Sequence, residues 1–257
     1  MSHSMFGEGC AIVIGGSGGI GAGICLEFAR SGTNVAICYN SKKAAADELQ
    51  TQITALGVSA SVHKVDARDP ASLKALFSDA ARQHGRVHSM VWAAGPLVDQ
   101  VLLQETSLEQ YKRAIDIEVL GFFNASQSAI RHFREQGGGV ILHLGSAGDS
   151  LWPARDGLSV APKAANESLV RGIAKEEGRH EIRANSILVG VIEAGMFLEL
   201  TKQGAFPQAW VDETQKMLCL KRWGKAEDIG AAAVFLCSDK AAYITGQQIS
   251  VSGGFGV

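Results

Sequence analysis

The sequence has almost no net charge and no long apolar run. Its 24 Lys and Arg residues against 26 Asp and Glu residues leave a formal charge of −2 at pH 7. This balance offers no electrostatic basis for binding nucleic acid or an anionic membrane surface. No apolar stretch reaches the roughly 18 residues of a membrane span, so no transmembrane helix is expected. The opening segment, MSHSMFGEG, lacks a basic start followed by an apolar core, which predicts no signal peptide and a cytoplasmic protein.

Cysteine, proline and tyrosine are also scarce. The five cysteines are scattered without a CxxC pair, which predicts core thiols in a reducing compartment and no metal site. The five prolines stand against 30 glycines, a ratio that indicates close backbone approaches in a folded chain. Only three tyrosines, Tyr39, Tyr111 and Tyr243, are available to supply a phenol to an active site.

Short apolar segments alternate with amphipathic helical patterns along the whole chain. This alternation predicts an α/β fold with a doubly wound parallel sheet covered by helices on both faces. No linker or repeat interrupts it, so we expect one domain over residues 1–257. The predicted strands are 11–14, 34–38, 59–65, 88–92, 139–144, 182–188 and 248–251, and the predicted helices begin at Ile20 and cover 42–56, 70–84, 108–136, 159–177 and 226–237.

The glycine-rich stretch CAIVIGGSGGIG, residues 10–21, follows the first predicted strand and opens the first predicted helix. Glycine permits a tight turn and lets the backbone approach a pyrophosphate, while the N–H groups and dipole of the new helix face the phosphates. The spacing Gly15-x-x-x-Gly19-x-Gly21 differs from plain G-x-G-x-x-G. The turn is therefore interpreted as a dinucleotide-binding turn, with a purely structural glycine turn as the alternative.

Residues 194–217 form an irregular insertion that follows a predicted strand. Ligands of such sheets bind beyond the carboxyl ends of the strands, so this segment is placed to act as a substrate lid. The alternative is a surface pair of helices that only packs. Its apolar side chains indicate an apolar small-molecule substrate unless they pack inward: Phe197, Leu198, Leu200, Phe206 and Trp210.

Several segments carry motifs that together make the chain similar to the short-chain dehydrogenase/reductase family over nearly its whole length. Residues 14–21 resemble the family's TGxxxGIG turn, and Ala93-Ala94-Gly95 stands where NNAG is usual. Residues 183–192 resemble RVNAIAPGxI, and residues 222–253 are similar to the family's C-terminal part. The resemblance implies a Rossmann fold and self-association as a homodimer or homotetramer, through helices around 108–136 and 159–177 and the last strand.

The resemblance also implies a nicotinamide dinucleotide as cofactor. The residues it assigns to cofactor binding are Gly15, Ser17, Gly18, Gly19, Ile20, Gly21, Asp66, Ala67, Ala93, Ala94, Gly95, Lys163, Gly190 and Ile192.

The end of the second predicted strand bears on which dinucleotide is used. An acidic residue there would hold the ribose hydroxyls of NAD, but the chain has Asn40, Ser41, Lys42 and Lys43 instead. Polar groups beside lysines accept a 2′-phosphate, which favours NADP(H) over NAD(H). The alternative is that both lysines belong to the solvated first turn of a helix.

The family's catalytic group is Asn-Ser-Tyr-Lys, and this chain matches only part of it. Ser146 fits the serine and Lys163 the lysine, but Ser159 stands in place of the tyrosine and Glu118 in place of the asparagine. A phenol near pKa 10, lowered by a nearby ammonium, is a useful proton donor for a carbonyl oxygen, whereas a serine hydroxyl is a poor acid.

Ser159 therefore has two interpretations. Because proline is tolerated only in a first helical turn, Pro162 predicts a helix start with Ser159 as its N-cap. In the functional interpretation, Ser159 shares a helix face with Lys163 and orients a carbonyl or a water. The family's 2,4-dienoyl-CoA reductases carry Ser at this position and place a Tyr further upstream as proton donor. Here that upstream region offers only Asp149, Arg155 and Asp156 as polar candidates.

Glu118 and His143 also have two interpretations each. Glu118 either forms a salt bridge with Lys163 or acts as a general base. His143 lies on a predicted buried strand, so the interpretation as a core histidine is preferred over a catalytic role.

Two functions remain open at this point. The first is an NADP(H)-dependent reductase of a carbonyl or conjugated enoyl substrate, with an atypical site that contains Ser146, Ser159, Lys163 and Glu118. The second is a non-redox protein on the same fold, either a binding or partner subunit or a lyase or isomerase.

Overall fold

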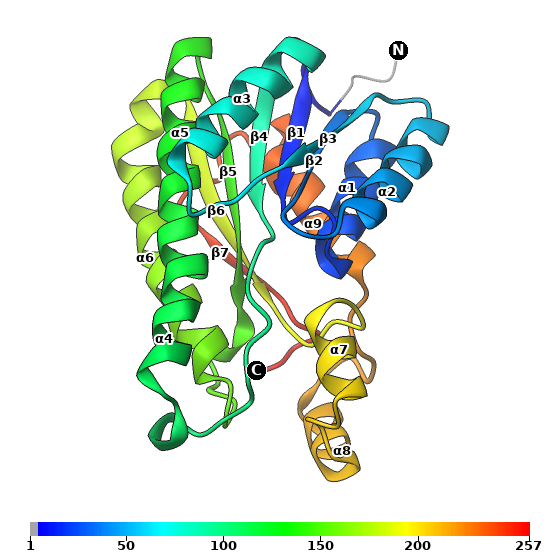
Figure 1. Ribbon diagram of the computed structural model, residues 1–257, viewed down its shortest axis with the longest axis vertical. Coiled ribbons are helices and arrows are strands. Elements are labelled where there is room, and N and C mark those ends of the chain that lie inside the picture. The colour runs from blue at the N-terminus through cyan, green and yellow to red at the C-terminus, as the bar shows by residue number, and fades with distance from the viewer. Residues whose placement is uncertain (1–4) are drawn as a thin grey trace.

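The computed structural model describes residues 5–257, so the first four residues of the predicted 1–257 domain lie outside the described range. Seven parallel strands form one sheet in the order β3-β2-β1-β4-β5-β6-β7, which confirms the predicted doubly wound α/β sheet (Figure 1). The strands are β1 (Cys10–Ile14), β2 (Asn34–Tyr39), β3 (Ala60–Lys64), β4 (Val87–Trp92), β5 (Gly139–Ser146), β6 (Ile182–Val189) and β7 (Gln248–Val251).

Helices cover both faces of this sheet. The longer helical segments are α1 (Gly19–Arg30), α2 (Lys43–Ala55), α3 (Pro70–His84), α4 (Leu108–Ile115), the π-helical η2 (Asp116–Leu120), α5 (Gly121–Gln136), α6 (Gly157–Glu177), α7 (Met196–Lys202), α8 (Gln208–Met217) and α9 (Ala226–Cys237). Helices α1, α2 and α9 lie on one face, and α3, α5 and α6 on the other (Figure 1).

Alternation along the strands explains why both faces are apolar. In β1, Ala11 and Val13 pack into the core under α1 and α9, whereas Ile12 and Ile14 pack into the core under α3 and α5. A strand buried on both faces has no polar position, which is why β1 reads as a continuous apolar run.

The parallel register gathers the carboxyl ends of the central strands at one edge of the sheet. Ile14 at the end of β1 pairs with Trp92 at the end of β4. Ser146 at the end of β5 pairs with Val189 at the end of β6. The segments that follow these strands therefore start side by side, at the edge beyond which α7 and α8 lie (Figure 1).

The predicted helix over 108–136 is interrupted. It begins at Ser107, whose hydroxyl accepts from Gln110 N at 3.1 Å while the Gln110 side chain accepts from Ser107 N at 2.8 Å. It then widens into a π-helical turn at Asp116–Leu120 before α5 continues. Such turns inside α-helices are frequent at functional sites, and this one carries Glu118 with its side chain buried.

The prediction that Ser159 is an N-cap is wrong. The N-cap of α6 is Asp156, whose carbonyl accepts from Ser159 N at 3.0 Å and from Val160 N at 2.9 Å. Ser159 is therefore the third helical residue, and Pro162 lies in the second turn. The helix tolerates Pro162 by giving up one backbone hydrogen bond, because proline has no N–H to donate to the Leu158 carbonyl.

The predicted start of α3 is confirmed. The Asp69 side chain accepts from Ala71 N at 2.9 Å, and Pro70 occupies the first helical position, where its missing N–H costs no hydrogen bond. Within residues 5–257, no helix combines the length and the apolar character that crossing a membrane requires.

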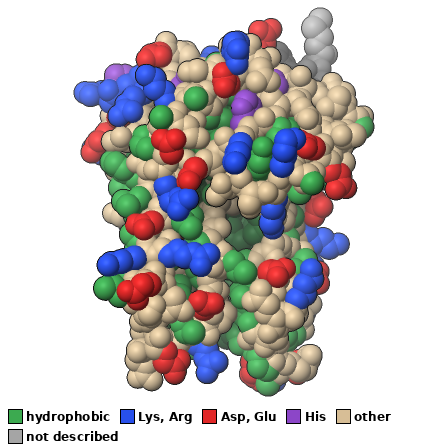
Figure 2. All heavy atoms as spheres, in the orientation of Figure 1, with side chains coloured by type: hydrophobic (Ala, Val, Ile, Leu, Met, Phe, Trp, Pro, Cys, Tyr) green, Lys and Arg blue, Asp and Glu red, His purple; other side chains and the backbone are tan. Residues whose placement is uncertain are grey.

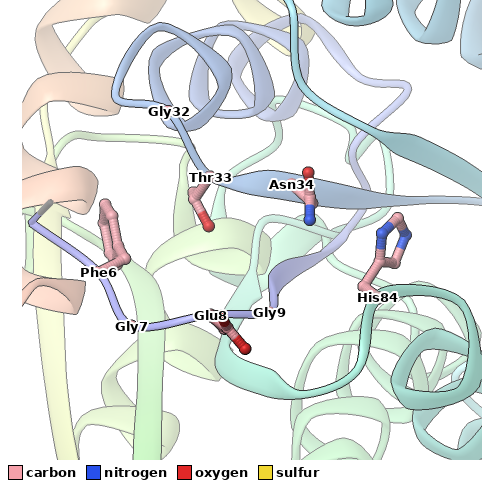
Figure 3. A pocket seen from close by; sticks show the side chains of 8 residues that line it. All are labelled: Phe6, Gly7, Glu8, Gly9, Gly32, Thr33, Asn34 and His84. Atoms are coloured by element: carbon pink, nitrogen blue, oxygen red, sulfur yellow. The ribbon is translucent and has the colours of Figure 1, made fainter.

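The opposite, amino-terminal edge of the sheet holds a pocket whose lining includes Phe6, Thr33 and His84 (Figure 3). Beside it, His88 stacks on Phe6 and is hydrogen-bonded to Thr33 Oγ1 at 2.8 Å. Burial, helped by the charge of Arg86, lowers the pKa of His88 to about 4.

Because His88 is buried in its neutral form, we expect the free energy of unfolding to fall at acid pH. A folded pKa of about 4 against an ordinary value of 6.5 means that the unfolded chain binds the proton first. The stability that neutral His88 contributes is complete above pH 6.5 and is lost as the pH falls toward 4. Between pH 7.5 and pH 4.5 the wild type should lose about 2–3 kcal/mol more than the His88→Gln variant. Urea unfolding at both pH values measures this, and parallel losses in the two proteins would contradict it.

Candidate active site

The glycine turn after β1 is built on contacts that leave no room for side chains. Gly15 has φ +87°, and a Cβ there would lie 2.6 Å from the carbonyl oxygen of Ala93 and the nitrogen of Ala94. A Cβ on Gly21 would lie 2.2 Å from the carbonyl oxygen of Gly15. The turn therefore packs directly against the end of β4, and only glycine satisfies both the conformation and the spacing.

The N-terminus of α1 has the features of an anion site. Its N-cap, Gly18, has no side chain to accept hydrogen bonds from the first-turn N–H groups, and the first turn carries no acidic residue. These N–H groups and the helix dipole favour a negative group such as a phosphate. A Cβ on Gly19 would lie 2.3 Å from the backbone nitrogen of Gly195, so the insertion over 194–217 starts directly against this turn.

The segment after β4 connects the glycine turn to the predicted catalytic residues. Ala93 N donates to the Ile14 carbonyl at 2.8 Å, which continues the β1–β4 pairing by one residue. Two residues later, a Cβ on Gly95 would lie 2.8 Å from Glu118 Oε2 and 3.9 Å from Lys163 Nζ. The turn, the 93–95 segment and the Glu118–Lys163 pair therefore form one continuous region.

Glu118 and Lys163 form an ion pair across the site. Lys163 Nζ lies 3.1 Å from Glu118 Oε2, and Trp92 Nε1 donates to Glu118 Oε1 at 3.1 Å. The Glu118 side chain is only 2% exposed, against 16% for Lys163. Burial alone would raise the pKa of Glu118, but the positive charges of Lys163 and His143 hold it below its ordinary value. Glu118 is thus a buried carboxylate beneath a partly accessible ammonium.

A second layer of polar groups lies behind this pair. His143 of β5 is fully buried, as its interpretation as a core histidine predicts. Its Nδ1 lies 3.0 Å from Glu167 Oε1 of α6, and its Nε2 lies 3.9 Å from Glu118 Oε1. Asn166 Nδ2 donates to the Glu118 carbonyl at 3.0 Å and lies 3.3 Å from His143 Nε2.

Sequence reasoning missed Glu167 and Asn166. One signal was available for Glu167, because it follows Lys163 by four residues and so shares its helix face. Nothing in the local sequence indicated its partner, since His143 comes from a strand twenty-four residues earlier.

Ser146 ends β5, and Ser159 lies in the first turn of α6, on the other side of the loop that joins them. The Ser146 hydroxyl accepts from Gly148 N at 3.1 Å and so caps the short turn after β5. A Cβ on Gly148 would lie 2.8 Å from Val160 Cγ2, so this turn rests on the start of α6 next to Ser159. Both serines are half-buried, and Ser159 is one helical turn before Lys163.

The three polar candidates in this loop differ sharply in their surroundings. Asp149 and Arg155 are exposed, whereas Asp156 is half-buried and accepts from Gln100 Nε2 at 3.1 Å. Burial raises the pKa of Asp156, although Gln100 and the charge of Lys163 oppose the shift. The spacing of Asp156, Ser159 and Lys163 places all three on one face of α6.

The three tyrosines lie on β2, on α4 and between α9 and β7. Tyr243 is fully exposed near the last strand, and Tyr111 is 41% exposed on α4. Tyr39 ends β2, and its carbonyl accepts from Val65 N at 2.8 Å.

The end of β2 is open to solvent. Asn40, Ser41 and Lys42 are all exposed there. Lys43 is different, because its Nζ lies 2.6 Å from Asp47 Oδ2. Of the two lysines, Lys43 is therefore already paired along α2.

The remaining predicted cofactor residues lie around the same edge. Asp66 binds the Arg68 guanidinium through both carboxylate oxygens, at 2.9 and 2.7 Å, and this pairing lowers its pKa to about 2. The Ala67 carbonyl accepts from Asn124 Nδ2 at 3.4 Å. A Cβ on Gly190 would lie 2.6 Å from Ser252 Cα, and Ile192 is buried and forms a bridge with Gly224.

Aromatic rings join the two helices of the 194–217 segment to the chain that follows. Phe206 stacks on Trp210 with ring centroids 4.2 Å apart, and Phe197 contacts Phe206 at 5.4 Å and Trp223 at 5.5 Å. All four rings are half-buried, whereas Leu200 is buried and Leu198 is exposed. In the space-filling view, a hollow that contains hydrophobic side chains opens near the middle of the visible face (Figure 2).

Comparisons with known proteins were made on the whole chain. A family model described as enoyl-(acyl carrier protein) reductase matches residues 15–256. The 3-oxoacyl-(acyl-carrier-protein) reductase FabG of Staphylococcus aureus is 31% identical over 244 residues, which span 95% of this chain and 96% of that protein. The 3alpha-hydroxysteroid dehydrogenase of Mediterraneibacter gnavus is 32% identical over 251 residues, 95% of each chain.

Solved structures are similar as well. A 7 alpha-hydroxysteroid dehydrogenase complexed with NADH and 7-oxo glycochenodeoxycholic acid superposes with a TM-score of 0.89 and 29% identity, over 99% of this chain and 97% of that one. A short-chain type dehydrogenase/reductase from Mycobacterium ulcerans gives a TM-score of 0.89 with 27% identity, over 97% and 90% of the two chains.

Because Gly15 approaches β4 closely, we expect alanine to destabilise the protein more at Gly15 than at Gly32. Gly15 and Gly32 both have positive φ, but a Cβ on Gly32 meets nothing within 4 Å. Gly32→Ala should therefore cost only the conformational strain, about 1–2 kcal/mol. Gly15→Ala adds a clash with the β4 backbone and should cost at least about 3 kcal/mol. Urea unfolding of both variants measures the difference, and equal losses would show that Gly15 is not sterically constrained.

Proposed function

Because the chain belongs to the short-chain dehydrogenase/reductase family, we propose that it is an NADP(H)-dependent reductase of a carbonyl or conjugated enoyl substrate. The observation that carries the proposal is the continuity from the glycine turn through Gly95 to Lys163 Nζ, which would lie 3.9 Å from a Cβ at position 95. This continuity connects a phosphate-binding turn to a partly exposed ammonium at one edge of the sheet.

The residues present fit a dinucleotide, which supplies a hydride when it is bound. The tight packing at Gly15 and Gly21 and the open first turn of α1 suit a pyrophosphate, held by residues 15–21. Asp66 and Ala67 would contact the adenine, residues 93–95 the adjoining ribose, and Lys163 the nicotinamide ribose hydroxyls. Gly190 and Ile192 would line the nicotinamide side.

The preference for NADP(H) rests on the end of β2. Asn40, Ser41 and Lys42 are exposed there with no acidic residue among them, so a 2′-phosphate would meet donors and a positive charge. Since Lys43 already pairs with Asp47, Lys42 is the lysine that would bind this phosphate.

Around the substrate, Ser146 and Ser159 would donate hydrogen bonds to the oxygen that gains negative charge. Each hydroxyl has one proton to donate, and the Ser146 hydroxyl already accepts from Gly148 N, which fixes its orientation. Preorganised donors of this kind stabilise a developing oxyanion. The site is atypical because no phenol accompanies them, so the proton must come from another ionisable group.

The 194–217 segment would act as the substrate lid. Its first residues lie against the glycine turn, and its aromatic rings form a half-buried apolar group beyond the carboxyl edge of the sheet. Rings of this type suit an apolar substrate, in agreement with the oxo-steroid that is bound by the structural relative.

Assembly as a homodimer or homotetramer is part of the proposal. Exposed apolar side chains follow α4, η2 and α5, among them Leu108, Tyr111, Leu120 and Phe123. A row of this kind on a long helical surface is typical of a protein–protein contact.

Titration with the two dinucleotides tests the cofactor assignment. We expect micromolar binding of NADPH, followed by nicotinamide fluorescence, and at least tenfold weaker binding of NADH. Lys42→Ala should weaken NADPH binding about tenfold and leave NADH unchanged, because one charge-assisted contact is lost. Lys43→Ala is the matched control and should have little effect. Absence of binding to either dinucleotide would favour the alternative, a non-redox protein on this fold.

Turnover tests the reaction class. We expect NADPH-dependent reduction of at least one member of a panel made of a 3-oxoacyl thioester, 7-oxo glycochenodeoxycholic acid and a conjugated enoyl thioester. Lys163→Ala should lower this rate at least about 100-fold, since it removes the group that would hold the nicotinamide ribose. Far-UV circular dichroism verifies that the variant folds. Substrate-dependent NADPH consumption that survives Lys163→Ala would overturn the assignment.

A further inference from the structure

Reduction of a carbonyl consumes a proton as well as a hydride, and the site has no tyrosine to give one. Two ionisable side chains, Asp156 and Lys163, share the relevant face of α6. Building on the proposed reductase function, we propose that the Lys163 ammonium is the proton donor and that Glu118, His143 and Glu167 form a buried relay that recharges it. These three residues are called the relay.

A lysine ammonium is a chemically plausible replacement for a phenol as proton donor. A lysine ammonium titrates near 10.4 and a phenol near 10, so the two are intrinsically similar as acids. A serine hydroxyl is far weaker, which limits Ser159 to hydrogen bonding. With 16% of its side chain exposed, Lys163 is accessible to solvent, while its Nζ also pairs with Glu118.

The relay is continuous in space. From Lys163 Nζ the path runs 3.1 Å to Glu118 Oε2, then 3.9 Å from Glu118 Oε1 to His143 Nε2, and then 3.0 Å from His143 Nδ1 to Glu167 Oε1. The first and last steps are within hydrogen-bond distance. The middle step must shorten by about 1 Å for a proton to pass.

With both carboxylates ionised, the charges of the cluster Lys163, Glu118, His143 and Glu167 balance when His143 carries a proton. Two buried carboxylates then face two cations, whereas a neutral His143 leaves one carboxylate charge unpaired in the interior. The charged groups that face His143 are Glu118 from η2 and Glu167 from α6, with Lys163 behind Glu118. From β6 and α5 it faces the neutral Ser186 and Phe122. From α6 it also meets the Asn166 amide at 3.3 Å, which must turn its oxygen toward Nε2 when that nitrogen carries a proton. The carboxylates outweigh burial and raise the pKa of His143.

Two further observations indicate a built site and not a chance cluster. Within residues 5–257, Glu167 Oε2 and Asn166 Oδ1 are buried without a hydrogen-bond partner, so two residues that contact His143 each keep an acceptor oxygen without a donor. A Cβ on residue 145 would lie 2.1 Å from Glu167 Oε1, so the glycine at that position makes room for the carboxylate.

In the proposed step, Lys163 loses one proton to the substrate and regains one from His143 through Glu118. An N–H bond of Lys163 breaks and an O–H bond forms on the substrate oxygen as hydride reaches the substrate carbon, which leaves the amine neutral. His143 Nε2 then gives its proton to Glu118 Oε1. After rotation about its Cγ–Cδ bond, the Glu118 carboxyl group passes a proton to Lys163 Nζ. The cluster of Lys163, Glu118, His143 and Glu167 is then one proton short, and the missing proton is that of His143. Lys163 passes a proton back through Glu118 to His143 Nε2 as its exposed side takes a new proton from solvent, which restores the starting state.

The protonation of His143 is tested without turnover. In protein labelled with ¹⁵N on histidine, with the signal assigned through His143→Asn, we expect His143 to be an imidazolium at pH 7. Glu167→Gln should lower its pKa and leave the signal of His132, on α5, unchanged as an internal control. A neutral His143 at pH 7 overturns the relay, because it would have no proton to give.

The pH profile of kcat tests whether the relay returns the proton to Lys163. The substrate is any member of the panel that the wild type reduces. His143→Asn and the milder Glu167→Gln should lower kcat about tenfold at pH 8.5 and much less at pH 6, where solvent reprotonates Lys163 readily. The Kd for NADPH should not change, which also shows that the variants fold. His132→Asn is the matched control and should retain the wild-type profile.

The remaining outcomes separate the relay from the proposed function. If Asp156→Asn lowers kcat while His143→Asn does not, Asp156 is the donor and the relay is overturned. If both relay variants lose rate equally at every pH, their role is structural and the relay is overturned. If the wild type binds neither dinucleotide, the reductase assignment fails, and the histidine titration alone still decides whether His143 holds the proton.

Discussion

A single buried carboxylate, that of Glu118, ties together the elements that form the site. It pairs with Lys163 of α6 and accepts from Trp92 of β4, while its own backbone carbonyl accepts from Asn166. Isolating a carboxylate in a protein interior costs several kcal/mol, and removal of one partner from a buried pair costs about 3–5 kcal/mol. The buried charge of Glu118 is stable only while its partners stay in place, which fixes β4, the π-helical turn and α6 relative to one another.

The parallel sheet supplies the second constraint. Because all seven strands run in the same direction, every chain segment that leaves a strand at its carboxyl end starts at the same edge. The glycine turn after β1 and the 93–95 segment after β4 meet there at separations that exclude any Cβ on Gly15. A dinucleotide would lie over this junction, with its phosphates at α1 and its reactive end toward Lys163.

The polar face at the start of α6 follows from where the helix begins. Because Asp156 is the N-cap, Ser159 has a free hydroxyl on the same face as Lys163 and does not spend it on capping. The face thus presents a carboxyl group, a hydroxyl group and an ammonium group in successive turns. Behind it, the glycine at position 145 admits the Glu167 carboxylate next to His143, so titratable groups also lie in the interior.

The sequence by itself determined the α/β alternation, the glycine turn, the cap at Asp69 and the spacing that places Lys163 on a helix. These features depend on residues that are neighbours along the chain, so periodicity and local chemistry reveal them. Only the tertiary structure decided that the 108–136 helix widens at Glu118, that α6 starts before Ser159, and that His143 meets Glu167. These contacts join residues from different strands and helices, and the packing of helices on the sheet, which no local pattern encodes, fixes their distances.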